Sequence, residues 1–189
     1  MSRTGPSKTV PDDFWQGRVR NARDFHSAAQ MLFELHEPGR NTNPIMVQVV
    51  EATIAYADAV TARRDSRINQ QDHQALGGLL RAILGNRLPN QQLPNLKAIL
   101  GEKDAVSYGA RPGSAVQARR MLERLDAFAA WVEEELVRWR AVRDSNSRRN
   151  RLWTLLHAIR FTAPYCVATG VATRKFSMIF PAVSGEHSY

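Results

Sequence analysis

The sequence lacks a second cysteine and any long run of apolar residues. Cys166 stands alone, so it cannot form an internal disulfide, and one thiol is too few for a cysteine-based metal site. No segment approaches the roughly 20 apolar residues that a membrane-spanning helix needs. Residues 1–13 are polar and contain no apolar segment typical of a signal peptide. These absences predict a soluble protein of the reducing cytoplasm that does not associate with a membrane.

Acidic residues are scarce in only one part of the chain. The 189 residues include 43% hydrophobic and 23% charged side chains, which is ordinary for one globular domain. The net charge of +8 is uneven, because residues 138–189 hold nine basic residues against two acidic ones. Residues 1–137 are nearly balanced, with 17 basic and 16 acidic residues. Because basic segments attract nucleic acid, we expect any such affinity to lie in the C-terminal part.

Apolar residues recur at helical spacing along most of the chain. Such patterns predict helices at 12–35, at 44–63, from about residue 72, and at 94–108. The wide apolar face of 44–63 predicts a central helix. No strand of comparable quality precedes residue 160, so the sequence predicts an all-α fold, an up-and-down bundle of four to five helices. The clearest helix is expected at 115–140, where six apolar residues keep a/d-type spacing: Ala118, Leu122, Leu125, Ala129, Val132 and Leu136.

Signals at the ends of these segments set their boundaries. Asp72 is placed to cap the helix that follows it, and Ser114 and Gln117 have the spacing of a capping box. We expect three parts in the chain: a flexible leader at 1–11, the helical bundle at 12–140, and a basic, largely irregular extension at 141–189.

Three segments of the helical body carry a family resemblance. They read "IAYADAVTARR", "QDHQALGGLLRAIL" and "LKAILGEKDAVSYGARPGSAVQARRMLERLDAFAAWVEEEL". Over about residues 20–140 the chain resembles the HEPN superfamily of small helical domains, in particular its SAV_6107-like bacterial branch. The stretch from Lys103 to Tyr108 and the turn after it are the most distinctive part of this resemblance.

The resemblance implies a helical bundle that often pairs with a second copy, in a family of which many members act on RNA. Ribonuclease members carry an arginine, an adjacent polar residue and a histidine four to six positions on. They bring the motifs of two protomers into a shared cleft, whereas other members lack the motif and are non-catalytic binding or partner modules. We expect a non-enzymatic HEPN-type binding module that forms a homodimer or docks a partner protein and binds RNA or a nucleotide. The alternative is a toxin-like, metal-independent endoribonuclease.

Arg67 and His73 are the candidate catalytic pair of that alternative. A histidine can accept the 2′-OH proton of RNA, and an arginine can stabilise the charge that develops on phosphate. However, Ile68 stands where the pattern wants a polar residue, and the pair lies between the second and third helices rather than near the end of the fold. We therefore favour an interpretation in which Asp72 caps a helix, His73 packs locally, and no catalytic residue is assigned.

Two groups of residues are candidates for contact with nucleic acid or a nucleotide. Lys103, Tyr108 and Arg111 could line a phosphate-binding groove, although a buried, hydrogen-bonded tyrosine beside exposed basic residues is the commoner arrangement. The second group belongs to an arginine-rich stretch at 138–160 with interspersed tryptophans, a combination that pairs with phosphates and stacks on bases. A C-terminal extension that has no function could have the same composition. The candidates in this stretch are Arg148, Arg149 and Arg151.

The remaining charged residues are predicted to be solvated. The glutamates at 133–135 form a charge run of the kind that usually faces water, and His26 and His36 are too scattered to indicate a metal site. We expect neither a metal nor a cofactor. Three arginines of the segment 115–140 share a side that is expected to be exposed: Arg119, Arg120 and Arg124.

Overall fold

The prediction of a mostly helical protein is confirmed. The computed structural model describes residues 6–70, 72–109 and 111–161, with side chains described as far as residue 139. Two short strands lie at β1 (Ser7–Thr9) and β2 (Arg67–Asn69), and two 3-10 turns at η1 (His73–Ala75) and η2 (Gly85–Arg87). The α-helices are α1 (Phe14–Glu34), α2 (Asn43–Asp65), α3 (Leu76–Leu84), α4 (Gln92–Gly101), α5 (Lys103–Tyr108) and α6 (Ala115–Phe161).

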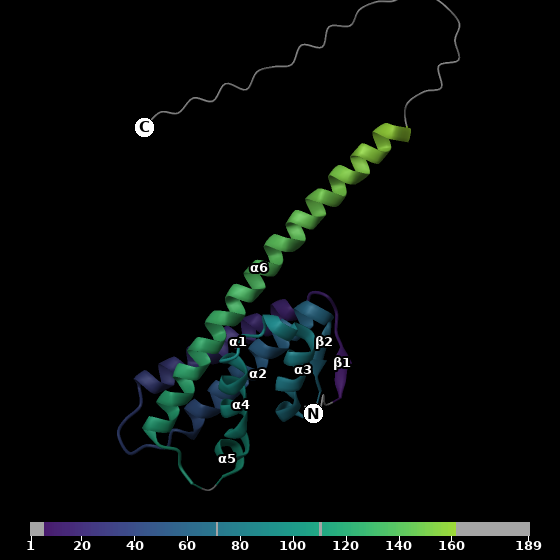
Figure 1. Cartoon of the computed structure of the whole chain (residues 1–189). Helices are drawn as coiled ribbons and strands as arrows, with labels where there is room; N and C mark the ends of the chain where they lie inside the picture. The colour runs from purple at the N-terminus through teal and green to yellow at the C-terminus, as the bar shows by residue number, and fades with distance from the viewer. Residues whose placement is uncertain (1–5, 71, 110, 162–189) are drawn as a thin grey trace, which may run out of the picture. The chain divides into compact units, whose positions relative to one another are not determined.

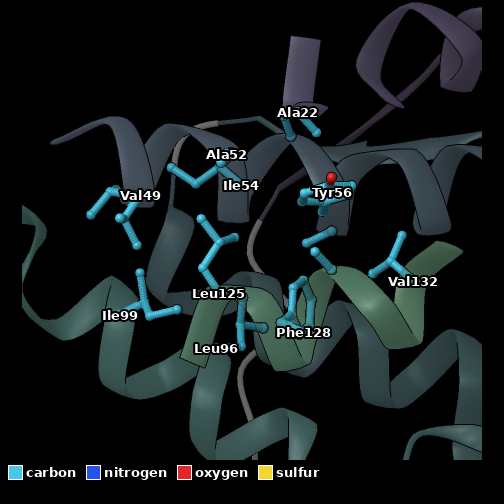
Figure 2. Packing of buried hydrophobic residues seen from close by; sticks show 14 of the residues in the cluster. Ala22, Val49, Ala52, Ile54, Tyr56, Leu96, Ile99, Leu125, Phe128 and Val132 are labelled. Carbon is cyan, nitrogen blue, oxygen red and sulfur yellow. The ribbon is translucent and has the colours of Figure 1, made fainter. Parts of the chain in front are cut away.

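Helix α2 is the central element, as its wide apolar face predicts. Every residue from 52 to 62 is buried, so the helix is covered on all sides. Figure 2 shows Val49 of α2 on the side of Ile99, with Ala22 of α1 on the other side of the helix. Alanines at the α1–α2 contact let the two backbones approach closely, and α6 and α4 supply the larger side chains opposite.

Helix α2 corrects the expectation that no segment approaches the length of a membrane-spanning helix, because alone among the described helices it is long and apolar enough to cross a membrane. Its apolar window is 83% buried against the rest of the chain. A helix whose apolar surface is already covered by protein has little left to offer lipid, so this composition is that of a core helix.

The strands correct the prediction that no strand precedes residue 160. β1 and β2 lie side by side (Figure 1) and pair antiparallel, with Ser7 opposite Asn69. Val10 N–H donates to the Ser66 carbonyl over 2.8 Å. Ser66 adopts a left-handed φ of 49° and ends α2, which turns the chain back along the N-terminal segment. Residues 7–10 are therefore paired rather than part of a flexible leader. Strands of three residues are too short to show a period of two in the sequence.

Helix α6 extends past its predicted end at residue 140 and finishes at Phe161. No glycine or proline occurs between 115 and 161, so nothing interrupts the backbone hydrogen bonding through the polar stretch. The predicted irregular extension is thus helical from 141 to 161, and residues 162–189 lie outside the described residues. The chain divides into two compact units, 1–146 and 147–189, and the site described next lies wholly in the first.

The helix expected at 94–108 is two helices, α4 and α5, separated at Glu102. Gly101 ends α4, in keeping with its low helix propensity. Half of the predicted capping box forms, because Gln117 N–H donates to Ser114 Oγ over 3.2 Å. The side chain of Gln117 donates instead to Glu102 Oε2 over 2.8 Å, which ties the start of α6 to the α4–α5 break.

Candidate functional site

Two arginines at the end of α2 stack on tryptophans from other helices. The guanidinium carbon of Arg63 lies 4.6 Å from the ring centroid of Trp15 on α1, and that of Arg64 lies 4.3 Å from the ring of Trp139 on α6. Cations are favoured in the last turn of a helix, where the backbone carbonyls carry partial negative charge. The α2 terminus therefore presents stacked, oriented guanidinium groups rather than freely moving ones.

Glu135 corrects the prediction that the glutamate run faces solvent. Its side chain is only 5% exposed and pairs with Arg64, whose side chain is 10% exposed. Arg138 Nη1 lies 3.8 Å from the second oxygen of the carboxylate. Consecutive residues of a helix point about 100° apart, so one member of a three-residue run can face the core while its neighbours face water. A buried carboxylate needs such partners, because an unpaired charge in the core is strongly unfavourable.

Burial lowers the pKa of Arg64, and nearby Arg87 lowers it further, while Glu135 opposes both effects. Arg87 belongs to the turn η2, which follows directly after α3. That helix ends at Gly85, whose φ of 54° is accessible to glycine at little cost. The sharp turn places the Arg87 guanidinium close enough to Arg64 for the two positive charges to interact.

These side chains line one cavity of about 460 Å³, which we call the basic pocket: Arg64, Arg87, Glu135, Arg138 and Trp139. Three arginines and one glutamate leave the lining with a formal charge of +2. Arg87 and Arg138 are exposed, whereas Arg64 and Glu135 are buried, so the pocket has a solvent-facing rim and a buried base.

Several hydrogen-bond donors of the basic pocket have no acceptor. Arg64 Nε and Trp139 Nε1 are buried, and neither donates to another atom in the described part of the chain. Within that same part, Arg87 forms no hydrogen bond or ion pair. Buried donors without acceptors are unfavourable in a folded protein, so a ligand that supplies oxygen acceptors would be stabilised here.

The predicted catalytic pair is not arranged as a joint site. Arg67 Nε donates to Asp65 Oδ2 over 2.6 Å, two residues back along the chain. Asp72 accepts from Gln74 N–H over 3.0 Å and from Ala75 N–H over 3.3 Å, so the predicted cap is confirmed on the turn η1. His73 is half-buried in that turn, and burial, then Lys103, lowers its pKa from the usual 6.5.

The second predicted group is only partly brought together. Tyr108 is 84% exposed, which contradicts the expectation of a buried, hydrogen-bonded tyrosine. Arg111 lines a separate cavity of about 550 Å³, in which its carbonyl accepts from Asn43 Nδ2 over 3.4 Å. Lys103 does not line that cavity. The tyrosine is exposed because α5 is a short helix that buries only Val106.

The predicted tail residues Arg148, Arg149 and Arg151 belong to the backbone of α6, and their side chains lie outside the described ones. The exposure predicted for Arg119, Arg120 and Arg124 is confirmed. No group of three or more His, Cys, Asp or Glu side chains in the described residues is placed to hold a metal ion.

Sequence reasoning missed most of the basic pocket. The sequence places Arg138 and Trp139 in the arginine-rich stretch at 138–160, and it indicates no site role for Arg64 or Arg87. The available signal was the alternation of arginine with tryptophan at 138–140, but nothing local relates it to residue 64 or 87. Comparison of the chain with protein-family models and with curated proteins finds no match.

Proposed function

We propose that this chain is a non-enzymatic helical binding module of HEPN type that binds RNA or a nucleotide at the basic pocket. The observation that carries the proposal is a cavity whose described lining has a formal charge of +2 and whose buried donors find no acceptor among the described residues. Phosphate oxygens supply both the negative charge and the acceptors. Arginine is the side chain best suited to such contacts, because its planar fork donates two parallel hydrogen bonds.

The chemistry of the pocket lining favours binding over catalysis. The described lining contains no histidine and one carboxylate, Glu135, which pairs with Arg64 and Arg138. Arg67, one half of the ribonuclease candidate pair, is bound to Asp65.

Pairing with a second copy or another protein is a further part of the proposal. Large apolar side chains are exposed near the end of α1: Met31, Leu32 and Leu35. Exposed apolar side chains close together on one helix are typical of contact surfaces. Light scattering over a range of concentrations tests this part, with a dimer mass as the expected result and a monomer at all concentrations as the contrary one.

The binding part is tested by titrating the full chain with a fluorescent single-stranded RNA at two salt concentrations. We expect affinity to fall as salt rises, because phosphate contacts release counterions. Arg87→Gln should weaken binding by roughly tenfold, the effect of one charge-assisted hydrogen bond of about 1.5 kcal/mol. The matched control is Arg124→Gln, an exposed arginine of α6 outside the pocket. Equal loss in both variants, or no RNA binding at all, would contradict the proposal.

A further inference from the structure

The charge of the basic pocket matches one kind of phosphate better than another. The lining side chains that the structure describes carry a formal charge of +2, from three arginines and one glutamate. A phosphate within a nucleic-acid strand carries one negative charge, whereas a terminal phosphate carries about 1.5 to 2 at neutral pH. The terminal group therefore neutralises the lining, and an internal phosphate leaves it positive.

The donors of the pocket also suit a group with three free oxygens. Arg64 Nε and Trp139 Nε1 are buried without acceptors, and Arg87 has no carboxylate partner among the described residues. A terminal phosphate has three oxygens that accept hydrogen bonds. An internal phosphate has two such oxygens, since the other two continue the strand.

The size of the cavity favours a ligand larger than phosphate alone. Arg64 and Glu135 are its more buried lining side chains, and Arg87 and Arg138 are exposed to solvent. The volume of about 460 Å³ falls in the range of roughly 300–1,000 Å³ typical of small-molecule sites. This volume is larger than one phosphate group fills, so the ligand that fits it carries an organic group besides its phosphate.

We infer that the basic pocket binds the terminal phosphate of a 5′-phosphorylated nucleoside, with Arg64, Arg87 and Trp139 donating to its oxygens. This inference rests on the proposed binding function and makes it specific. The same chemical group occurs in a free nucleoside monophosphate and at the 5′ end of an RNA, and both fit the recognition described. Glu135 holds Arg64 in place at the base, so it positions the site without contacting the phosphate.

The test compares two RNAs of one sequence, with a 5′-phosphate and with a 5′-hydroxyl, titrated into the full chain. We expect the phosphorylated RNA to bind roughly tenfold more tightly, the effect of a charge-assisted hydrogen bond. A nucleoside 5′-monophosphate should displace it, and the unphosphorylated nucleoside should not. Arg87→Gln should abolish the difference between the two RNAs, while Arg124→Gln should keep it. Arg87 is exposed, so its replacement leaves the fold intact, which a thermal melt verifies.

The outcomes separate this inference from the proposed function. Equal binding of both RNAs, without displacement by the monophosphate, would overturn the inference and leave RNA binding standing. Absence of binding by either RNA and by the monophosphate would overturn both. Displacement by inorganic phosphate as effective as that by the nucleotide would show that the pocket does not recognise an organic body, and would also overturn the inference.

Discussion

Arg18 of α1 donates a 2.7 Å hydrogen bond to Asp58, a carboxylate in the most buried stretch of α2. The pair is incompletely satisfied, since Asp58 Oδ1 and Arg18 Nε are buried without a hydrogen-bond partner in the described part of the chain. Burial raises the pKa of Asp58 to about 6, although Arg18 opposes the shift. The contact that joins α1 to the central helix is therefore sensitive to pH.

The free energy of unfolding should carry the signature of Asp58. The folded state holds this proton more tightly than the unfolded chain, where the pKa has its ordinary value of 3.8. Unfolding thus releases a proton between about pH 4 and 6, and the contribution of Asp58 to stability falls as pH rises through this window. In the unsubstituted chain, this effect should lower the free energy of unfolding by up to about 3 kcal/mol across the window, and Asp58→Asn should abolish that fall.

Urea denaturation at pH 4, 5, 6 and 7 measures this effect. The control is Asp104→Asn, a change to an exposed carboxylate in the first turn of α5. That control should follow the unsubstituted chain at every pH. An equal pH dependence for Asp58→Asn and the unsubstituted chain would show that Asp58 does not titrate in this window.

Core and surface contacts of α6 should differ widely in their contribution to stability. Phe128 is fully buried and packs against Trp131 with ring centroids 5.4 Å apart, so Phe128→Ala should cost about 3–5 kcal/mol. Arg23 makes two hydrogen bonds to Glu133, but these side chains are 57% and 34% exposed, and Arg23→Ala should cost less than about 1 kcal/mol. Urea unfolding of both variants at pH 7 measures the ratio. Similar costs would show that the α1–α6 ion pair is stabilised beyond an ordinary surface pair.

His73 should be neutral at pH 7 and dispensable for any effect on RNA. Burial and the charge of Lys103 lower its pKa below 6.5, so its titration by NMR should have a midpoint under that value. Under metal-free conditions, the full chain and His73→Ala should leave RNA equally intact. Cleavage by the full chain that is lost in His73→Ala would instead place chemistry at His73 and support the ribonuclease alternative.

The tail arginines should add affinity for RNA without selecting its end. Replacing Arg148, Arg149 and Arg151 together by glutamine removes three charges, and the salt dependence of RNA binding should fall by about 2 in slope, at roughly 0.7 per charge. Binding of a nucleoside monophosphate, measured by calorimetry, should stay unchanged. A parallel loss of nucleotide binding would assign the phosphate site to the tail rather than to the basic pocket.

The elements that could be predicted are those governed by neighbours in the chain. Asp72 caps the turn that follows it, because its carboxylate needs only the next few backbone N–H groups. The apolar spacing in α6 indicates a buried face, and Leu125 and Phe128 lie on it, because helix geometry alone brings such residues to one side. The strands were missed because each depends on the other, far away in sequence.

The candidate site could not be predicted because its members come from distant segments. Arg64 ends α2, Arg87 lies in η2, and Trp139 belongs to α6. Each is an ordinary surface residue when only its neighbours are considered. Glu135 shows the difficulty most clearly: its spacing from Phe128 and Val132 places it on the buried face of α6, but nothing local indicates the distant Arg64 that pairs with it.

By itself, the sequence determined where helices form and where most of the basic charge is concentrated. Those properties follow from apolar period, caps and composition, which act over a few residues. The tertiary structure alone decided which charged side chains are buried, which of them pair, and which donors lack an acceptor. The physical reason is that desolvation and ion pairing depend on packing between α2, η2 and α6. The burial of Arg64, its pairing with Glu135 and its lowered pKa therefore arise only in the folded chain.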